Sequence, residues 1–215
     1  MEAEFWHNRW EENQIGWHQP DGNILLTQYF GELDLPVGQC VFIPLCGKSR
    51  DIQWLLSHGY KVKGAELSEL AITHLFEDLR ITPTIREEGN FKHYSGDHID
   101  IYVGDFFDLS AEQIGPIDAV YDRAAYVALP IPMREKYAHH LAELTDHAPQ
   151  LLITFLYDQS LVNGPPFSIP SQELQDHYAD TYEIEKVTAI SLLGGIRWQC
   201  SSEEIVWHLR PKTGA

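Results

Sequence analysis

Hydrophobic and polar positions along the chain change between two spacings, which predicts strands and helices in alternation. The apolar run 40–45 is typical of a buried strand, and 60–65 predicts a second one. Between them, apolar residues at helical spacing predict a helix that begins after Ser49 and ends at Gly59. Together these segments form a β-α-β unit, whose crossover we expect to be right-handed.

The same alternation continues to the C-terminus. Gly89 and Asn90 indicate a surface turn within 82–94, where we expect a hairpin excursion. Further strands are predicted at 99–103, 117–121, 151–156, 183–190 and 203–209. Further helices are predicted at 2–12, 23–33, 69–79, 133–144 and from Ser171 to about 179. We expect Ser68 to cap the helix at 69–79 and Ser171 to cap the last helix. The last two strands have no helix between them, which favours an antiparallel hairpin.

The predicted fold is α/β. We expect a three-layer Rossmann-like sandwich with a mostly parallel seven-stranded sheet that ends in an antiparallel hairpin. Residues 1–33 are expected to form an N-terminal helical lid. A length of 215 residues indicates a single domain over 1–215.

Acidic residues follow two of the predicted strands, at the sheet edge where open α/β folds bind ligands. Glu66 lies 19 residues after Gly47, close to the ~20-residue offset at which a carboxylate holds ribose hydroxyls. Its alternative role is a solvated charge at a strand end. Asp105 could accept a hydrogen bond from an adenine amino group while Phe106 stacks on the ring. The alternative for this pair is a helix-capping aspartate beside a core phenylalanine.

The same region lacks both common phosphate-binding motifs. The residues at 47–49 resemble the end of a P-loop, but Phe42 stands where that motif needs its first glycine. The G-x-G-x-x-G fingerprint of dinucleotide sites is also absent, which makes a nucleotide-dependent oxidoreductase improbable. A nucleoside without phosphate, such as S-adenosylmethionine (AdoMet), therefore fits better.

Three tryptophans precede the first predicted strand, namely Trp6, Trp10 and Trp17. They could pack the N-terminal segment onto the sheet, or they could close over the cofactor. AdoMet is a sulfonium cation, and a tryptophan face attracts a cation by about 0.5–2 kcal/mol. We expect Trp10 to form a wall of the cofactor site and Trp6 to belong to the core.

Composition and charge exclude several classes of function and partner. A net charge of −17 argues against nucleic acid as a partner. We expect no membrane span, signal peptide or metal site, because long apolar runs and paired Cys/His ligand spacings are absent. Three cysteines without CxxC spacing are read as reduced thiols, which predicts a cytoplasmic protein. The connection 159–170 contains two adjacent prolines after a glycine, and such a stiff loop is commonly a lid.

Several motifs together resemble one enzyme family. They are V-F-I-P-L-C-G-K-S (41–49), G-A-E-L-S-E (64–69), G-D-F-F-D-L (104–109), Y-D-R-A-A (121–125) and G-P-P-F-S-I-P (164–170). In combination they are similar to the bacterial thiopurine S-methyltransferases, a family of class I AdoMet-dependent methyltransferases. The resemblance covers roughly residues 4 to 190.

The resemblance implies a role for each matching position. Cofactor contacts are expected from Trp10, Leu45, Gly47, Glu66, Leu67, Asp105, Phe106 and Arg123, and substrate contacts from Trp17, Pro166, Phe167 and Arg197. Arg123 is also the expected catalytic residue. It would favour an acceptor thiolate or anchor the methionine carboxylate, and its alternative role is an ion pair with Asp122 or another carboxylate. The chain departs from the mammalian pattern after Glu185, where Arg197 could replace a missing basic function.

The resemblance implies S-methylation of thiopurines or of aromatic and heterocyclic thiols. The methyl group would come from AdoMet, would leave S-adenosylhomocysteine, and would need no metal. Selenium or tellurium compounds are further expected acceptors, with tellurite detoxification as a consequence. A monomer that acts on small molecules is expected. An AdoMet-binding sensor or partner-binding module without turnover is the alternative.

Overall fold

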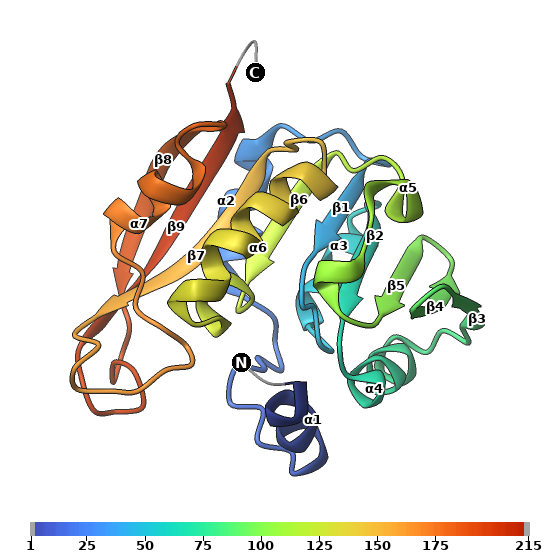
Figure 1. The fold of residues 1–215 in the computed structure, drawn as a ribbon, viewed down its shortest axis with the longest axis horizontal. Coiled ribbons are helices and arrows are strands. Elements are labelled where there is room, and N and C mark those ends of the chain that lie inside the picture. Colours follow the sequence, from blue (N-terminus) through green and yellow to red (C-terminus); the bar gives the residue numbers. More distant parts are fainter. Residues whose placement is uncertain (1–2, 213–215) are drawn as a thin grey trace. The chain divides into compact units, whose positions relative to one another are not determined.

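The computed structural model describes residues 3–212, and Figure 1 shows its helices and strands. The chain divides into two compact units, residues 1–118 and 119–215. Each unit contains parallel strands, antiparallel strands and helices of its own. A single domain over 1–215 stays a prediction. Among the described residues, no helix is long and apolar enough to cross a membrane.

The first unit is built on five strands in the order β3-β4-β5-β2-β1. β2 pairs in parallel with β1 and β5, whereas β4 pairs antiparallel with β3 and β5. Its strands are β1 (Cys40–Ile43), β2 (Lys61–Glu66), β3 (Thr84–Glu88), β4 (Phe91–Gly96) and β5 (Ile99–Val103). Its helices are α1 (Ala3–Glu11), α2 (Ile24–Tyr29), α3 (Arg50–Ser57), α4 (Glu69–Leu79) and α5 (Ala111–Ile114), with 3₁₀ turns η1 (Phe30–Leu33) and η2 (Phe106–Asp108).

The second unit has four strands in the order β6-β7-β9-β8. β6 pairs in parallel with β7, whereas β9 pairs antiparallel with β7 and β8. The strands are β6 (Ala119–Arg123), β7 (Gln150–Tyr157), β8 (Tyr182–Ser191) and β9 (Ser202–Pro211). The helices are α6 (Ile131–Leu144) and α7 (Ser171–Tyr178), and η3 (Tyr126–Ala128) is a 3₁₀ turn. Tyr137, Ala138 and Leu141 form the buried face of α6.

Two of the predicted N-terminal helix caps are confirmed, at the start of α3 and of α4. The Ser49 hydroxyl accepts a hydrogen bond from the backbone of Asp51 at 3.2 Å, and Ser68 accepts from Ala71 at 3.3 Å. The prediction that Ser171 caps α7 is wrong, because Pro170 occupies the cap position and Ser171 is the first helical residue. Pro170 has φ −64° and ψ 144°, an extended conformation from which a helix can start without a side-chain cap.

The described part of the chain contains nine strands, two more than the seven that we expect from the sequence. The hairpin that we expect within 82–94 is confirmed, since β3 and β4 pair antiparallel on either side of the turn at Gly89 and Asn90. It does not stand outside the sheet, because β4 also pairs with β5. β6 also extends to Arg123, two residues beyond the predicted end. The α/β class and the final antiparallel hairpin, β8–β9, are confirmed.

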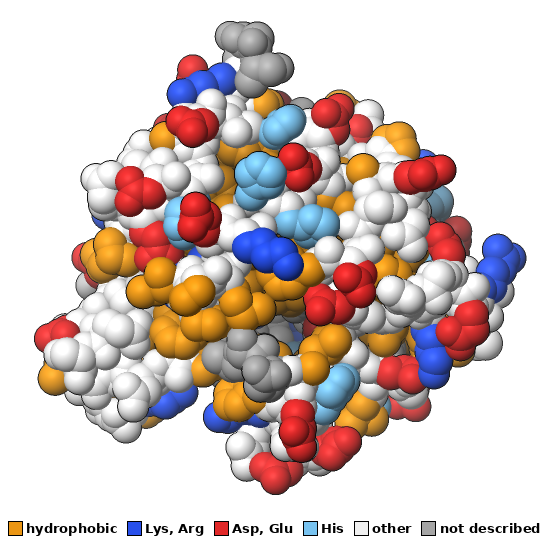
Figure 2. All heavy atoms as spheres, in the orientation of Figure 1, with side chains coloured by type: hydrophobic (Ala, Val, Ile, Leu, Met, Phe, Trp, Pro, Cys, Tyr) orange, Lys and Arg blue, Asp and Glu red, His pale blue; other side chains and the backbone are white. Residues whose placement is uncertain are grey.

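Surface charge follows the composition. On the face that Figure 2 shows, acidic side chains are spread over the surface, and basic side chains stand among them singly or in small groups. A phosphate backbone needs clustered Lys and Arg, and this face does not provide a continuous basic stripe.

Candidate functional site

The carboxylate of Glu66 holds the end of β2 against the turn that follows β1. Its Oε2 accepts a hydrogen bond from the backbone N–H of Gly47 at 2.9 Å, and its Oε1 accepts from that of Ser68 at 2.8 Å. Glu66 is only 6% exposed, and burial raises its pKa, although the backbone hydrogen bonds partly oppose that rise. A carboxylate can accept about four hydrogen bonds, so this geometry leaves lone pairs for a vicinal diol.

The turn after β1 has a backbone conformation that ordinary residues rarely adopt. Leu45 has φ +45° and Gly47 has φ +50°. A Cβ atom on Gly47 would lie 2.9 Å from the ring of Trp10. The absence of a side chain at Gly47 therefore lets Trp10 of α1 lie directly on this turn.

The N-terminal tryptophans form an aromatic cluster around that contact. Trp17 packs edge-on against Trp10, with ring centroids 5.8 Å apart, and against Trp6 at 5.5 Å. Trp10 is 7% exposed, whereas Trp17 is half-buried. The structure thus brings the predicted residues Trp10 and Gly47 together and adds Trp17 beside them.

Asp105 caps a 3₁₀ turn and Phe106 is buried, while their expected contacts with adenine stay predictions. Oδ1 of Asp105 accepts from the backbone N–H of Phe107 at 2.9 Å and so caps η2. Phe106 is 3% exposed, and its ring lies 6.5 Å from that of Phe42 in the core. In this conformation Phe106 offers little surface for stacking, whereas Asp105 is exposed at the end of β5.

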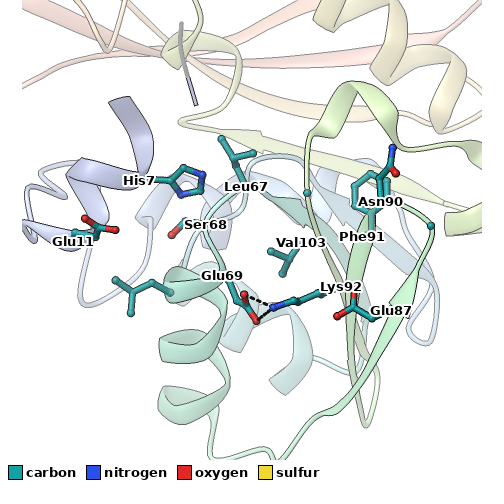
Figure 3. Close-up of a pocket in the computed structure, with 13 residues that line it drawn as sticks. His7, Glu11, Leu67, Ser68, Glu69, Glu87, Asn90, Phe91, Lys92 and Val103 are labelled. Atoms are coloured by element: carbon teal, nitrogen blue, oxygen red, sulfur yellow. Dashed lines mark hydrogen bonds and ion pairs between the residues drawn. The ribbon is translucent and has the colours of Figure 1, made fainter. Parts of the chain in front are cut away.

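A cavity of about 490 Å³ lies beside these strand ends (Figure 3). One side is lined by Leu67, which follows β2, and by Val103 and Gly104 at the end of β5. His7 and Glu11 of α1 line it as well. Of the predicted cofactor residues, Leu67 alone is among those lining this cavity. Its shape depends on α1 and the β3–β4 hairpin.

The cavity also has a charged wall that the sequence motifs did not indicate. Nζ of Lys92 donates to Oε2 of Glu69 at 2.7 Å (Figure 3). Behind this pair, the Tyr94 hydroxyl donates to Oε1 of Glu69 at 2.7 Å. These hydrogen bonds to Lys92 and Tyr94 lower the pKa of Glu69. The sequence carried no signal for this wall, since it needs the pairing of the hairpin with β5.

Cys46 lies in the same turn but is unsuited to act as a nucleophile. Burial, reinforced by the nearby Glu66 carboxylate, raises the pKa of its thiol well above the ordinary value. Only the thiolate is strongly nucleophilic. Among the described residues, no group of three or more His, Cys, Asp and Glu side chains could hold a metal ion.

In the second unit, Asp122 and Arg123 occupy successive positions at the end of β6. Oδ1 of Asp122 accepts from the backbone N–H of Tyr126 at 3.1 Å, and Oδ2 accepts from the Tyr137 hydroxyl at 2.7 Å. Asp122 is fully buried, and that burial raises its pKa to about 6. Successive side chains of a strand point to opposite faces, so Arg123 points away from the Asp122 carboxylate.

The loop 159–170 is held in place by hydrogen bonds from several sides. The backbone N–H of Phe167 donates to the carbonyl of Val127 at 2.7 Å, and the Tyr157 hydroxyl donates to that of Pro166 at 2.6 Å. Nη2 of Arg197 donates to the carbonyl of Pro165 at 2.8 Å. The structure therefore brings the predicted substrate residues Pro166, Phe167 and Arg197 into one loop cluster.

Comparison with known proteins gives the same assignment over nearly the whole chain. The family model described as "Thiopurine S-methyltransferase (TPMT)" matches residues 1–207. A protein of Xanthobacter autotrophicus named thiopurine S-methyltransferase is 47% identical over 97% of this chain and 99% of its own. A protein of Acinetobacter baylyi with the same name is 48% identical over 86% of this chain and 87% of its own.

Solved structures show the same fold at low sequence identity. A SAM-dependent methyltransferase from Anabaena variabilis is 13% identical and matches with a TM-score of 0.66 over 98% of this chain and 95% of its own. Magnesium protoporphyrin IX methyltransferase from Synechocystis, solved with bound SAH, is 16% identical and matches with a TM-score of 0.63 over 97% of this chain and all of its own. These likenesses concern the fold alone.

Proposed function

The chain belongs to the thiopurine S-methyltransferase family, and from that membership we propose that it methylates the sulfur of thiopurines or of other aromatic and heterocyclic thiols. The methyl donor is AdoMet and the second product is S-adenosylhomocysteine. One structural observation supports the proposal: the buried Glu66 carboxylate lies at the end of β2 and accepts a hydrogen bond from the backbone N–H of Gly47. That geometry suits a ribose diol, and the site needs no phosphate-binding glycine loop.

The first unit supplies the groups for the nucleoside. Glu66 binds the ribose hydroxyls, and Leu45 and Gly47 let the ligand approach the backbone of the turn. Leu67 contacts the adenine ring, and the adjoining cavity of about 490 Å³ gives the ring room. Asp105 accepts from the adenine amino group, with Phe106 behind it. Trp10 closes the site and faces the cationic sulfonium.

The chemical step is a displacement at carbon. The acceptor sulfur attacks the methyl group, the bond from that carbon to the sulfonium sulfur breaks, and its electron pair neutralises the leaving sulfur. The thiol proton goes to solvent before or during attack. Because aromatic thiols ionise readily, the rate depends mainly on holding the three reacting atoms in line.

The acceptor side is assigned to Trp17, Arg123, Pro166, Phe167 and Arg197. Arg123 favours the thiolate form or anchors the methionine carboxylate of AdoMet. Asp122 positions the backbone after β6 and takes no part in proton transfer, since both of its oxygens accept hydrogen bonds within the second unit. Small selenium and tellurium compounds, including tellurite, are further proposed acceptors.

The proposed enzyme is a cytoplasmic monomer that uses no metal and acts on small molecules. These points rest on family analogy and on the reduced thiols expected of Cys40, Cys46 and Cys200. The same resemblance extends the acceptor range to metalloids, with tellurite detoxification as the outcome.

Incubation with methyl-labelled AdoMet and 6-mercaptopurine tests the proposal. We expect labelled S-methyl product and one equivalent of S-adenosylhomocysteine, with chelators having no effect. Parallel reactions with thiophenol, selenite and tellurite define the acceptor. Binding of AdoMet by calorimetry without transfer to any of these acceptors would favour a sensor instead of an enzyme.

A further inference from the structure

Arg134, in the first turn of α6, is a buried cation outside the predicted site. It is 1% exposed, and burial of a charge is unfavourable unless that charge is paired. Its Nε and Nη2 donate to the two carboxylate oxygens of Glu173 in α7, the Nη2 bond being 2.9 Å long. Its Nη1 donates to the backbone carbonyl of Leu129 at 2.9 Å. The guanidinium is therefore held by both α7 and the chain before α6.

The guanidinium of Arg134 also lies against two aromatic rings. Its Cζ atom is 5.6 Å from the ring centroid of Phe167 and 5.9 Å from that of Tyr126. Phe167 belongs to the segment 164–167 of the loop 159–170, and its backbone N–H donates a hydrogen bond to the carbonyl of Val127 in η3. The cation thus contacts the acceptor loop directly and the η3 turn through Tyr126.

The partners of Arg134 are themselves connected to the end of β6. The Tyr126 hydroxyl lies 3.2 Å from Oε1 of Glu173 and 2.6 Å from Nδ1 of His177. The backbone N–H of Tyr126 donates to Asp122, the residue next to Arg123. The chain of contacts therefore runs from the loop residue Phe167 through Arg134 and Tyr126 to the residue beside Arg123.

A buried ion pair is a poor means of stabilisation, because an apolar pair of equal volume is often as stable. An arginine does fix an orientation, because its planar guanidinium donates two parallel hydrogen bonds to one carboxylate. This two-point contact, called the fork below, sets the plane of the guanidinium and hence the face that an aromatic ring can contact. The geometry of Arg134 and Glu173 has this form. The Phe167 ring lies over this guanidinium, 5.6 Å from Cζ to the ring centroid.

We propose that Arg134, held by Glu173, is a positioning residue that sets Phe167 and the loop 164–167 for the methyl acceptor. The proposal rests on the function proposed above, which assigns this loop to the acceptor. It deepens that function by separating acceptor positioning from cofactor binding. Loss of the fork should alter acceptor kinetics and leave AdoMet affinity unchanged.

The test compares Arg134→Lys with wild type and with Glu135→Gln, an exposed neighbour on the same helix. Lysine keeps the charge but loses the fork and the plane. We expect kcat/KM for the acceptor to fall about tenfold, an effect that slight misplacement of a bound group readily produces. The AdoMet dissociation constant by calorimetry should stay within about twofold, a change far smaller than the acceptor effect. The Glu135→Gln variant should match wild type in both.

Hydrogen exchange gives a readout that does not depend on turnover. Arg134→Lys should speed exchange of the Phe167 amide, while amides of β7 keep their protection. The double variant Arg134→Lys with Phe167→Leu should lose no more acceptor kcat/KM than the worse single variant, since both changes act on one contact.

Unchanged acceptor kinetics and unchanged Phe167 exchange in folded Arg134→Lys would overturn the proposal, and so would fully additive losses in the double variant. If Arg134→Lys fails to fold, Glu173→Gln replaces it with the same readouts. If wild type methylates no acceptor, the proposed function fails, and the exchange of Phe167 still decides whether Arg134 positions the loop.

Discussion

Oε2 of Glu66 accepts a hydrogen bond from the backbone N–H of Gly47 at 2.9 Å, across 19 residues of sequence. The same carboxylate accepts from Ser68, which caps α4, so one side chain joins the turn after β1 to the start of α4. The residue assigned to the ribose is therefore also part of the scaffold of its own site. Substitutions at Glu66 should affect both binding and the local backbone.

Glu66→Ala should weaken AdoMet binding at least about tenfold, because hydrogen bonds to a charged group contribute about 1.5–3 kcal/mol. Calorimetric titration with AdoMet measures the loss. Glu112→Gln, which changes an exposed carboxylate on α5, is the matched control and should bind normally. Unaltered affinity in a folded Glu66→Ala protein would refute the ribose assignment.

Gly47→Ala should displace Trp10 from the turn. The new Cβ would lie 2.9 Å from the Trp10 ring, and alanine at φ +50° is strained by about 1–2 kcal/mol. We expect a lower melting temperature and a red-shifted tryptophan emission. Gly31→Ala is the control, since a Cβ there meets no atom within 4 Å. Equal behaviour of the two variants would disprove the close contact between α1 and the turn.

Arg123→Ala should reduce methyl transfer by about a hundredfold or more while preserving the melting temperature, because the lost group acts on bound ligand. Steady-state kinetics and thermal unfolding of the same preparation measure the two effects. Asp122 already accepts hydrogen bonds from Tyr126 and Tyr137, so removal of the neighbouring cation should leave that network intact. A large drop in melting temperature with near-normal turnover would favour the ion-pair role instead.

The stability of the protein should depend on the ionisation of Asp122. Burial raises its folded-state pKa from 3.8 to about 6, so the folded state holds this proton more tightly than the unfolded state. The contribution of Asp122 to the free energy of unfolding is therefore most favourable below pH ~3.8, falls as pH rises to ~6, and is constant above that. Asp122→Asn removes this contribution.

Urea unfolding of wild type and Asp122→Asn at a series of pH values checks this. The stability of wild type relative to the variant should decline between pH ~4 and ~6. Tyr137→Phe, which removes one hydrogen bond to the ionised carboxylate, should move the decline to higher pH because that bond lowers the pKa. A pH-independent difference would show that Asp122 has an ordinary pKa in the folded protein.

Local sequence determined much of the scaffold of this protein. The caps Ser49 and Ser68 and the strand 99–103 were predicted correctly, because helix starts and buried strands depend on neighbouring residues. The position of Glu66 at a strand end followed from the same local pattern. The motifs around these residues were sufficient for the family, which the comparisons confirm.

Tertiary structure decided which partners several polar and aromatic residues have in the folded chain. Phe106 is packed near Phe42 in the core, and Asp105 caps η2, two contacts that the sequence offered only as alternatives to a place beside the ligand. Their contacts with adenine stay predictions. The hairpin at 84–96 followed from its turn residues, but its pairing with β5, which makes it part of the sheet, did not. The physical reason is that burial and pairing depend on partners far away in sequence. Arg134 and Phe167, brought together over 33 residues of chain, illustrate this dependence.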